Sequence, residues 1–238
     1  MNKPVVLQNG EWLFPIMFWT KPANLPFINE RDKLGLSADQ VRALVHDRSI
    51  LRGANVFCST DRGRTFTMLG QARFPDADLP TEHMLIERRD GRLWMLVRTR
   101  YGIGSTISTD GGRTWSPPRD SGIAHPSTHF FIRRLGSGRL LLVKNAPPKG
   151  KDRSHLTAFL SDDDGRTWIG GLLLDDRVNV SYPDGVQSGE GLVRVVYDRE
   201  RFTAREILMA AFREEDVRAG TCVSADARLR IVVNRAGP

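Results

Sequence analysis

Several side chains that could act on an acidic ligand lie at the ends of strand-like segments. Glu82 opens one such segment, Arg98 lies near the end of the next, and Tyr182 opens another after a long loop. Strand alternation would place Arg100 on the same face as Arg98. Arginines bind carboxylates through paired hydrogen bonds and keep their charge, and a phenol becomes a nucleophile when a base takes its proton. These residue types suit an anionic substrate.

Further polar residues are candidates for binding, each with a structural alternative. Arg153 precedes a strand-like segment and is either a ligand-binding residue or a solvated loop arginine. His125 and His129 flank a turn into a strand, and Pro126 opposes the helix that a metal-binding histidine pair would need. Asp184 either hydrogen-bonds a ligand or serves a Pro-Asp-Gly turn. We therefore expect no metal site here.

The elements that must position these residues are mostly strands. Apolar segments bounded by Asp-Gly and Ser-Gly pairs indicate strands at 10–16, 91–99, 138–145, 156–161 and 192–198. Only two helices are predicted. Ser37 can cap one at 38–48, inside an insertion at about 17–52, and the other, at 214–220, should end at Gly220.

An internal repeat sets the period of these strands. The octets STDRGRTF (59–66), STDGGRTW (108–115) and SDDDGRTW (161–168) begin about 50 residues apart, a spacing that fits propeller blades. In each octet the aspartate can accept backbone amides and the glycine can supply the positive φ of a tight turn. We expect the final ring to be buried. The aspartates are Asp61, Asp110 and Asp163, and the rings are Phe66, Trp115 and Trp168.

These octets resemble the Asp-box, or BNR, repeat of the sialidase (neuraminidase) superfamily. The resemblance implies an all-β fold, a β-propeller of four-stranded antiparallel blades, with the boxes structural and away from the active site. The family has six blades, whereas this length encodes about four to five. We therefore expect a single, partial propeller domain over residues 1–238 that begins within a blade and lacks the N-terminal blades.

The resemblance also assigns roles to the polar residues. Glu82 and Arg98 are similar to the sialidase pattern in which an Asn-Glu pair opens a strand and Leu-x-x-Arg follows, although Thr81 stands in place of the asparagine. It implies that Glu82 activates Tyr182 as the nucleophile and that arginines bind the substrate carboxylate. The substrate-binding residues implied are Arg98, Arg153, Arg100, His125 and Asp184.

The implied reaction is retaining hydrolysis of a terminal α-linked sialic acid or a related acidic sugar. A tyrosine nucleophile avoids the repulsion that a carboxylate would meet beside the substrate carboxylate, and sialidases are exceptions to the two-carboxylate rule. Pro183 stands after Tyr182 where the family usually has serine, which leaves the register open by one residue. The family's first arginine and its acid/base aspartate have no counterpart before Glu11. A non-catalytic BNR module that binds glycans or proteins, or another glycosidase or lyase, remains the alternative.

Composition and charge narrow the classes of partner. The chain has 238 residues and a net charge of +7, which suits either an anionic partner or plain solubility. The arginines are scattered and form no nucleic-acid-binding module, so we expect an acidic glycan or small sugar, with no nucleic acid and no membrane. An open propeller would expose strand edges, so a homo-oligomer is possible.

The sequence contains no motif that indicates a cofactor, a metal site or a targeting signal. Cys58 and Cys222 have no metal-binding spacing, and we expect no cofactor. No apolar run approaches the length of a membrane span. The first residues have no apolar core of a secretory signal, which favours a cytoplasmic location by default.

Overall fold

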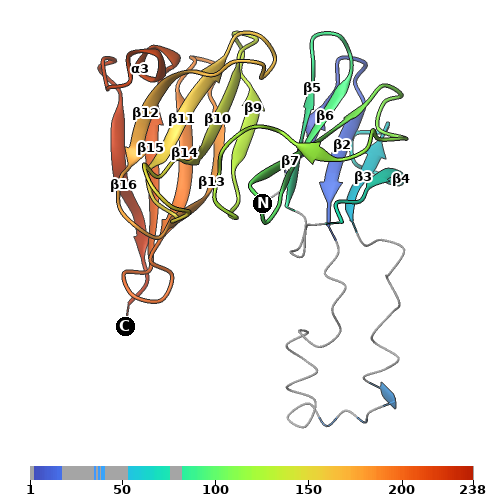
Figure 1. Ribbon diagram of the computed structural model, residues 1–238, viewed down its shortest axis with the longest axis horizontal. Helices are drawn as coiled ribbons and strands as arrows, with labels where there is room; N and C mark the ends of the chain where they lie inside the picture. The colour runs from blue at the N-terminus through green and yellow to red at the C-terminus, as the bar shows by residue number, and fades with distance from the viewer. Residues whose placement is uncertain are drawn as a thin grey trace.

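The described residues form four antiparallel sheets of four strands each, arranged as the blades of a β-propeller (Figure 1). The structure is a computed structural model that describes residues 3–17, 35, 37, 39–40, 53–75 and 82–237. Strands follow one another in sequence order across each blade. The predicted all-β propeller class is confirmed.

The four blades have the following strands. Blade 1 consists of β1 (Val5–Val6), β2 (Trp12–Ile16), β3 (Ala54–Ser59) and β4 (Thr67–Ala72). Blade 2 consists of β5 (His83–Glu87), β6 (Leu93–Arg98), β7 (Ile103–Ser108) and β8 (Arg119–Asp120). Blade 3 consists of β9 (Phe131–Arg134), β10 (Leu140–Asn145), β11 (Leu156–Ser161) and β12 (Ile169–Asp175). Blade 4 consists of β13 (Val180–Gln187), β14 (Val193–Arg199), β15 (Glu206–Phe212) and β16 (Arg228–Arg235).

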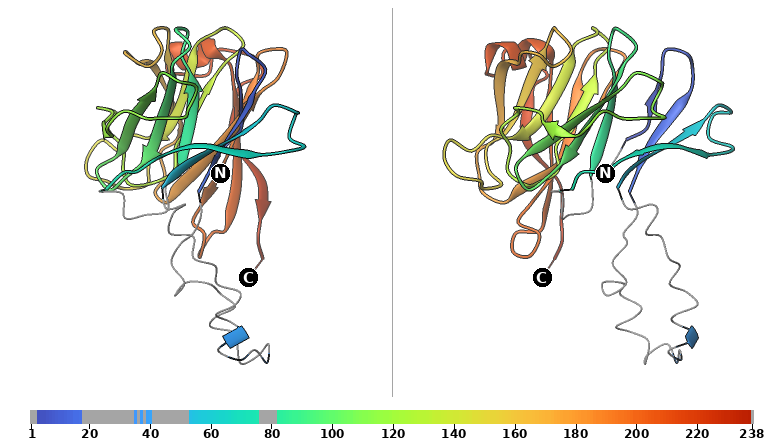
Figure 2. Two further views of the ribbon diagram at one scale, coloured as in Figure 1. Left: turned by 90° about the vertical axis from the view of Figure 1, so that its right-hand side faces the viewer. Right: turned by 45° about the vertical axis from the view of Figure 1, so that its right-hand side comes forward.

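The first strand of each blade faces the inside of the arrangement. Strand β5 contacts both β1 and β9, and β9 contacts β13, so the first strands of successive blades meet (Figure 2). The expectation that the chain begins within a blade is wrong, because β1 is the short innermost strand of a complete four-stranded sheet. Lys3 then reaches blade 4, where its ammonium donates to the Gly185 carbonyl at 2.6 Å.

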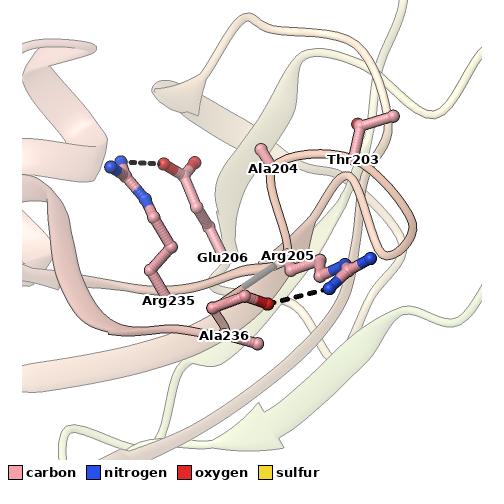
Figure 3. Close-up of a pocket in the computed structure, with 7 residues that line it drawn as sticks. Thr203, Ala204, Arg205, Glu206, Arg235 and Ala236 are labelled. Atoms are coloured by element: carbon pink, nitrogen blue, oxygen red, sulfur yellow. Dashed lines mark hydrogen bonds and ion pairs between the residues drawn. The ribbon is translucent and has the colours of Figure 1, made fainter.

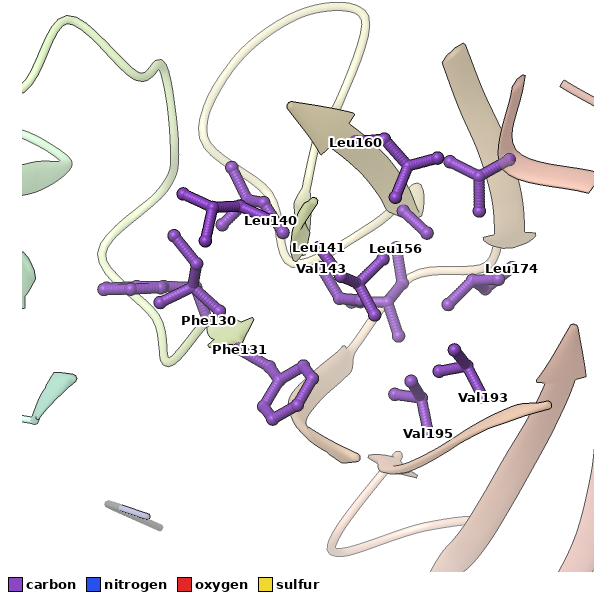
Figure 4. Close-up of a cluster of buried hydrophobic side chains, with 14 of the residues drawn as sticks. Phe130, Phe131, Leu140, Leu141, Val143, Leu156, Leu160, Leu174, Val193 and Val195 are labelled. Carbon is purple, nitrogen blue, oxygen red and sulfur yellow. The ribbon is translucent and has the colours of Figure 1, made fainter. Parts of the chain in front are cut away.

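In blades 2 and 3 the second strand carries the core, because the side chains on both of its faces are covered by neighbouring blades. All six residues of β6 are buried, and β10 is buried at every position except Lys144. Each fully buried leucine or valine contributes roughly 1.5–3 kcal/mol relative to exposure. Figure 4 shows the largest cluster, in which Leu140, Leu141 and Val143 of β10 lie among side chains of neighbouring strands. The predicted strands at 10–16, 91–99, 138–145, 156–161 and 192–198 correspond to β2, β6, β10, β11 and β14.

Each repeated octet is the turn between the third and fourth strands of a blade. In the second octet the Asp110 carboxylate accepts the amides of Arg113 at 3.1 Å and Thr114 at 2.9 Å. Ser108 Oγ donates to Asp110 at 2.7 Å and accepts the Gly112 amide at 2.8 Å. Gly112 has φ +95°, a conformation that favours glycine. The first and third octets repeat these bonds around Asp61 and Asp163.

The rings that end the octets are less buried than the sequence indicates. Trp115 and Trp168 are partly buried and pack against the two core clusters. Phe66 is instead 52% exposed, and the expectation that it is buried is wrong. It packs edge-on against Phe14 at 5.0 Å between centroids. Phe66 therefore contacts another partly exposed ring of blade 1 rather than the core.

Blade 4 has a helix where the other blades have an octet. Helix α3 (Glu214–Ala219) ends at Gly220, which has φ 70°, as predicted. The Asp216 carboxylate takes the place of the octet aspartate, because it accepts two backbone amides of the following loop. Gly170 of β12 lets the helix approach, since a Cβ there would lie 2.1 Å from the Val217 carbonyl oxygen.

The predicted insertion at about 17–52 lies almost entirely outside the described residues. Within it, Ser37 Oγ accepts the Gln40 amide at 3.2 Å, and the Gln40 side chain accepts the Ser37 amide at 2.8 Å, a capping-box arrangement. In the described ranges, no helix has the length and apolar character needed to cross a membrane.

The octet network predicts a stability defect without a binding defect. Asp110→Ala leaves the Thr114 and Arg113 amides without their acceptor, so we expect its melting temperature to fall by several degrees. Asp120→Ala is the matched control, because among the described residues that carboxylate accepts a single amide, that of Gly122. Thermal unfolding followed by circular dichroism measures the difference. Unchanged melting in Asp110→Ala, or normal melting with lost ligand binding, would contradict a structural role.

Candidate active site

The candidate site lies at the end of the blades opposite the octet turns. The β5–β6 turn is at the octet end, because the Arg89 amide donates to Asp164 of the third octet at 2.8 Å. Glu82 and Arg98 lie at the other ends of these two strands, where the Arg98 amide donates to the Glu82 carbonyl at 3.0 Å. In Figure 1 helix α3 marks the octet end and the C-terminus the opposite one. The sheet itself therefore fixes the spacing of Glu82 and Arg98.

Tyr182 lies in a β-bulge. The antiparallel pairing of β13 with β14 jumps from Ser181 to Asp184, so that Tyr182 and Pro183 together face Tyr197. Tyr182 has φ +54°, which is uncommon for a bulky residue. Proline fits a bulge because the missing N–H costs no ladder bond there. Pro183 is thus part of the β-bulge that sets the direction of the Tyr182 ring.

Three of the predicted residues form a closed hydrogen-bonded triangle. The Tyr182 hydroxyl donates to Glu82 Oε1 at 3.0 Å and accepts from Arg98 Nη1 at 3.1 Å. Arg98 Nη1 also lies 2.9 Å from Glu82 Oε2. Arg98 Nη2 donates to the Ser127 carbonyl at 2.9 Å, which fixes the guanidinium plane. A phenol, its proton acceptor and a cation are thus in direct contact, although Glu82 and Tyr182 are far apart in sequence.

Glu82 carries its charge while almost fully buried. It is 4% exposed. Burial alone would raise the pKa of this carboxyl, but His129 and the Arg98 guanidinium outweigh burial and lower the pKa to about 2. His129 Nδ1 lies 3.6 Å from Glu82 Oε2. Glu82 is therefore ionised at neutral pH and can accept the phenolic proton.

Arg153 completes the charged side of the cluster. Its guanidinium lies 5.9 Å from the centroid of the Tyr182 ring, and its carbonyl accepts the Val180 amide at 2.9 Å at the start of β13. Burial lowers the pKa of Arg153, and the charge of Arg98 lowers it further. Within the described part of the chain the Arg153 guanidinium has no hydrogen-bonding or ion-pairing partner. It is available to an anionic ligand.

Arg201 belongs to the cluster but was not predicted. It follows β14, forms an ion pair with Asp198, and its guanidinium lies 4.1 Å from the centroid of the Tyr182 ring. His129 also stacks on this ring, with centroids 5.6 Å apart and planes 21° apart. Finding Arg201 from the sequence would require knowing that β14 pairs with the bulged segment of Tyr182.

His125 supports the site through the backbone. Its Nε2 lies 3.0 Å from the Thr128 carbonyl, and its Nδ1 lies 3.4 Å from the Asn145 carbonyl. Burial lowers the pKa of His125 to about 3, so the ring is neutral. A neutral imidazole has one N–H, which serves the shorter contact. His125 thereby braces the loop that presents the Ser127 carbonyl to Arg98.

Two predicted binding residues are placed differently from expectation. Strand β6 ends at Arg98, so the alternation that would put Arg100 on its face does not continue, and Arg100 is exposed in the following bend. Asp184 lies inside β13, so the Pro-Asp-Gly turn is wrong. Its carboxylate lies 3.3 Å from the Lys3 ammonium, a contact that joins blade 4 to the start of blade 1.

A pocket of about 500 Å³ lies elsewhere, at the ends of β15 and β16 (Figure 3). Its charged groups are paired within the chain, since Arg235 binds Glu206 and Arg205 binds the Gly237 carbonyl. None of the predicted site residues lines it. Over the described ranges, no group of three or more histidine, cysteine, aspartate or glutamate residues has a geometry that could hold a metal.

Comparison with known families now bears on this geometry. The model of the family described as BNR repeat-like domain matches residues 1–195. The chain belongs to this family. All three octets of this BNR domain lie within the matched residues. No curated protein sequence matches the chain significantly.

Solved structures with the same fold include glycoside hydrolases. The NanB sialidase of Streptococcus pneumoniae aligns with 90% of this BNR domain and 30% of its own chain, at 16% identity and a TM-score of 0.61. A Hadza microbial sialidase, Hz136, aligns with 90% of this chain and 37% of its own, at 20% identity and a TM-score of 0.62. An α-L-arabinanase of Penicillium chrysogenum aligns with 95% of this chain and 65% of its own, at 13% identity and a TM-score of 0.55. The BNR domain thus spans about a third of the length of these sialidases, and its scaffold is one that glycoside hydrolases use.

The buried charge of Glu82 predicts a specific pH dependence of stability. Its pKa is lowered from an ordinary 4.5 to about 2, so its contribution is present above pH 4.5 and is lost as the pH falls to about 2. Between these pH values the wild type should lose about 3 kcal/mol more unfolding free energy than Glu82→Gln. Urea unfolding across this range measures it, with the exposed Glu190→Gln as control. Parallel pH curves for wild type and Glu82→Gln would contradict the assignment.

Proposed function

We propose that this BNR domain carries the nucleophile half of an exo-sialidase-like glycoside hydrolase. The substrate is a terminal α-linked sialic acid or a related acidic sugar, cleaved with retention of configuration. The observation that carries the proposal is the 3.0 Å hydrogen bond from the Tyr182 hydroxyl to the ionised Glu82, inside a cluster of arginines. The resemblance of Glu82, Arg98, Arg153 and Tyr182 to the sialidase pattern supports it.

Binding begins with the substrate carboxylate. Arg153 has no partner among the described residues and lies beside the Tyr182 ring, so it offers its guanidinium to an anion. Arg98 exchanges part of its contact with the Tyr182 hydroxyl for the carboxylate as the substrate enters. Paired hydrogen bonds from guanidinium to carboxylate orient the anomeric carbon towards the phenol.

Cleavage proceeds through a covalent intermediate. The Tyr182 oxygen forms a bond to the anomeric carbon while its proton passes to Glu82 Oε1 and the glycosidic C–O bond breaks. The leaving oxygen takes a proton from a general acid that we do not assign to a residue of this chain. Water then attacks the anomeric carbon and gives one proton to the conjugate base of that general acid, while the bond to Tyr182 breaks and the tyrosine oxygen recovers its proton from Glu82. Two inversions give net retention.

A second candidate function is binding of an acidic glycan without turnover. One observation favours it: across the described segments, no carboxyl group other than Glu82 hydrogen-bonds to Tyr182 or Arg98. A module with the nucleophile pair and the arginines but no general acid would hold its ligand and leave it intact.

The decisive variant is Tyr182→Phe, which removes only the hydroxyl. With a fluorogenic α-sialoside we expect kcat to fall by roughly 10²–10⁴-fold while folding is retained. A fluorinated sialic acid that traps the intermediate should add covalently to Tyr182, as mapped by mass spectrometry. The exposed Tyr101→Phe is the control and should keep wild-type activity.

The outcomes separate the candidates. An adduct on another residue, or full activity in Tyr182→Phe, refutes the nucleophile. A wild type that binds sialic acid in calorimetry but hydrolyses no sialoside establishes the binding module instead. Weak binding by Arg153→Ala in the same measurement would show that this arginine holds the carboxylate.

A further inference from the structure

The conformation of Tyr182 requires support from outside its own strand. Its φ of +54° lies in the left-handed region, which is costly for a bulky residue and persists only where surrounding contacts hold it. The bulge also removes Tyr182 from the regular pairing with β14. Side-chain contacts must therefore fix the direction of the ring.

Arg201 supplies the closest charged contact to that ring. Its Cζ lies 4.1 Å from the ring centroid, nearer than the 5.9 Å of Arg153. A planar guanidinium stacks on an aromatic face and is attracted by its electron density. Because this attraction strengthens as negative charge develops on the phenol, the contact favours the state in which the proton has left.

Arg201 is itself fixed to the strand next to Tyr182. Its Nε pairs with the Asp198 carboxylate, and its Nη2 lies 3.4 Å from Ser181 Oγ. Asp198 also accepts Ser181 Oγ at 2.7 Å. Ser181 precedes Tyr182 and is paired with Asp198 across the sheet, at the last regular position before the bulge. Ser181, Asp198 and Arg201 thus form a chain of contacts that leads from the residue before Tyr182 to the Tyr182 ring.

The other side chains around the ring come from different blades. His129, just before β9 of blade 3, stacks on the ring, and Glu82, just before β5 of blade 2, binds the hydroxyl. Arg201 and Asp198 both come from the end of blade 4 that carries Tyr182. Blades 3 and 4 thus contact the Tyr182 ring, while Glu82 and Arg98 of blade 2 bind its hydroxyl.

We propose that Arg201, held by Asp198 and Ser181, is a positioning residue that keeps the Tyr182 hydroxyl on Glu82. This role deepens the proposed function and depends on it for its catalytic consequence. Arg201 is distinct from the arginines that we assign to the substrate carboxylate, because its guanidinium is ion-paired with Asp198 and stacks on the Tyr182 ring.

Kinetics test the catalytic consequence. Arg201→Met removes charge and planarity but keeps an unbranched apolar stem, and we expect kcat for a fluorogenic sialoside to fall about 10–100-fold with KM changed less than about threefold. Arg201→Lys keeps the charge and should recover part of the loss. Arg194→Met is the matched control, since Arg194 is exposed on the same β14 strand. Wild-type kcat in Arg201→Met, or a loss confined to KM, overturns the role.

Fluorine NMR tests the positioning without any activity. The chain has three tyrosines, so 3-fluorotyrosine labelling gives a simple spectrum in which Tyr182→Phe identifies the signal of interest. A held ring should show separate signals for its two fluorine positions. In Arg201→Met these should merge as the ring flips faster, while Arg194→Met keeps them apart. A single averaged Tyr182 signal in the wild type, or separate signals in Arg201→Met, overturns the role.

Kinetics and fluorine NMR together distinguish failure of the proposed function from failure of the Arg201 role. If the wild type hydrolyses no sialoside, the proposed function fails and the fluorine spectra alone decide on Arg201. If the wild type is active and Arg201→Met matches it in both measurements, the proposed function stands and the positioning role fails.

Discussion

The buried negative charge of Glu82 is the constraint on which the site depends. A carboxylate that is 4% exposed must be neutralised, and Arg98 does so at 2.9 Å while also binding the Tyr182 hydroxyl and the Ser127 carbonyl. Each of these contacts comes from a different part of the chain. Blades 2, 3 and 4 must therefore be correctly packed before the Glu82 carboxylate and Arg98 have all their partners. The hydrogen bond between Tyr182 and Glu82 is a result of that packing.

The octet aspartates and the candidate site lie at opposite ends of the blades and depend on different kinds of contact. At the octet end Asp61, Asp110 and Asp163 each accept several donors from their own turn, so these three charges are compensated within one blade. At the opposite end the bonds run between blades, and Arg153 keeps a guanidinium without a partner in the described residues. Removing one of these three aspartates therefore affects mainly the turn of its own blade. A change at Glu82, Arg98 or Tyr182 instead affects contacts between blades.

Much of this could be predicted from the sequence, and the failures have physical causes. The octets indicated the fold class and the blade period, and the strand-end positions of Glu82, Arg98, Arg153 and Tyr182 pointed to residues that the structure brings together. The bulge at Tyr182 could not be predicted, because it depends on which residues of β13 and β14 pair. Arg201 follows from that same pairing. Arg100 was misplaced because alternation was extended past the end of β6.

The charge balance of the site connects these observations to a ligand. Three arginines, Arg98, Arg153 and Arg201, surround Tyr182, and two carboxylates, Glu82 and Asp198, pair with two of them. Among the described residues the cluster thus has one positive charge in excess, located on Arg153. A neutral sugar would leave that charge uncompensated as it displaced water from the site, at a cost in free energy. A sugar with one carboxylate would neutralise it, and this charge balance supports the acidic substrate that we propose.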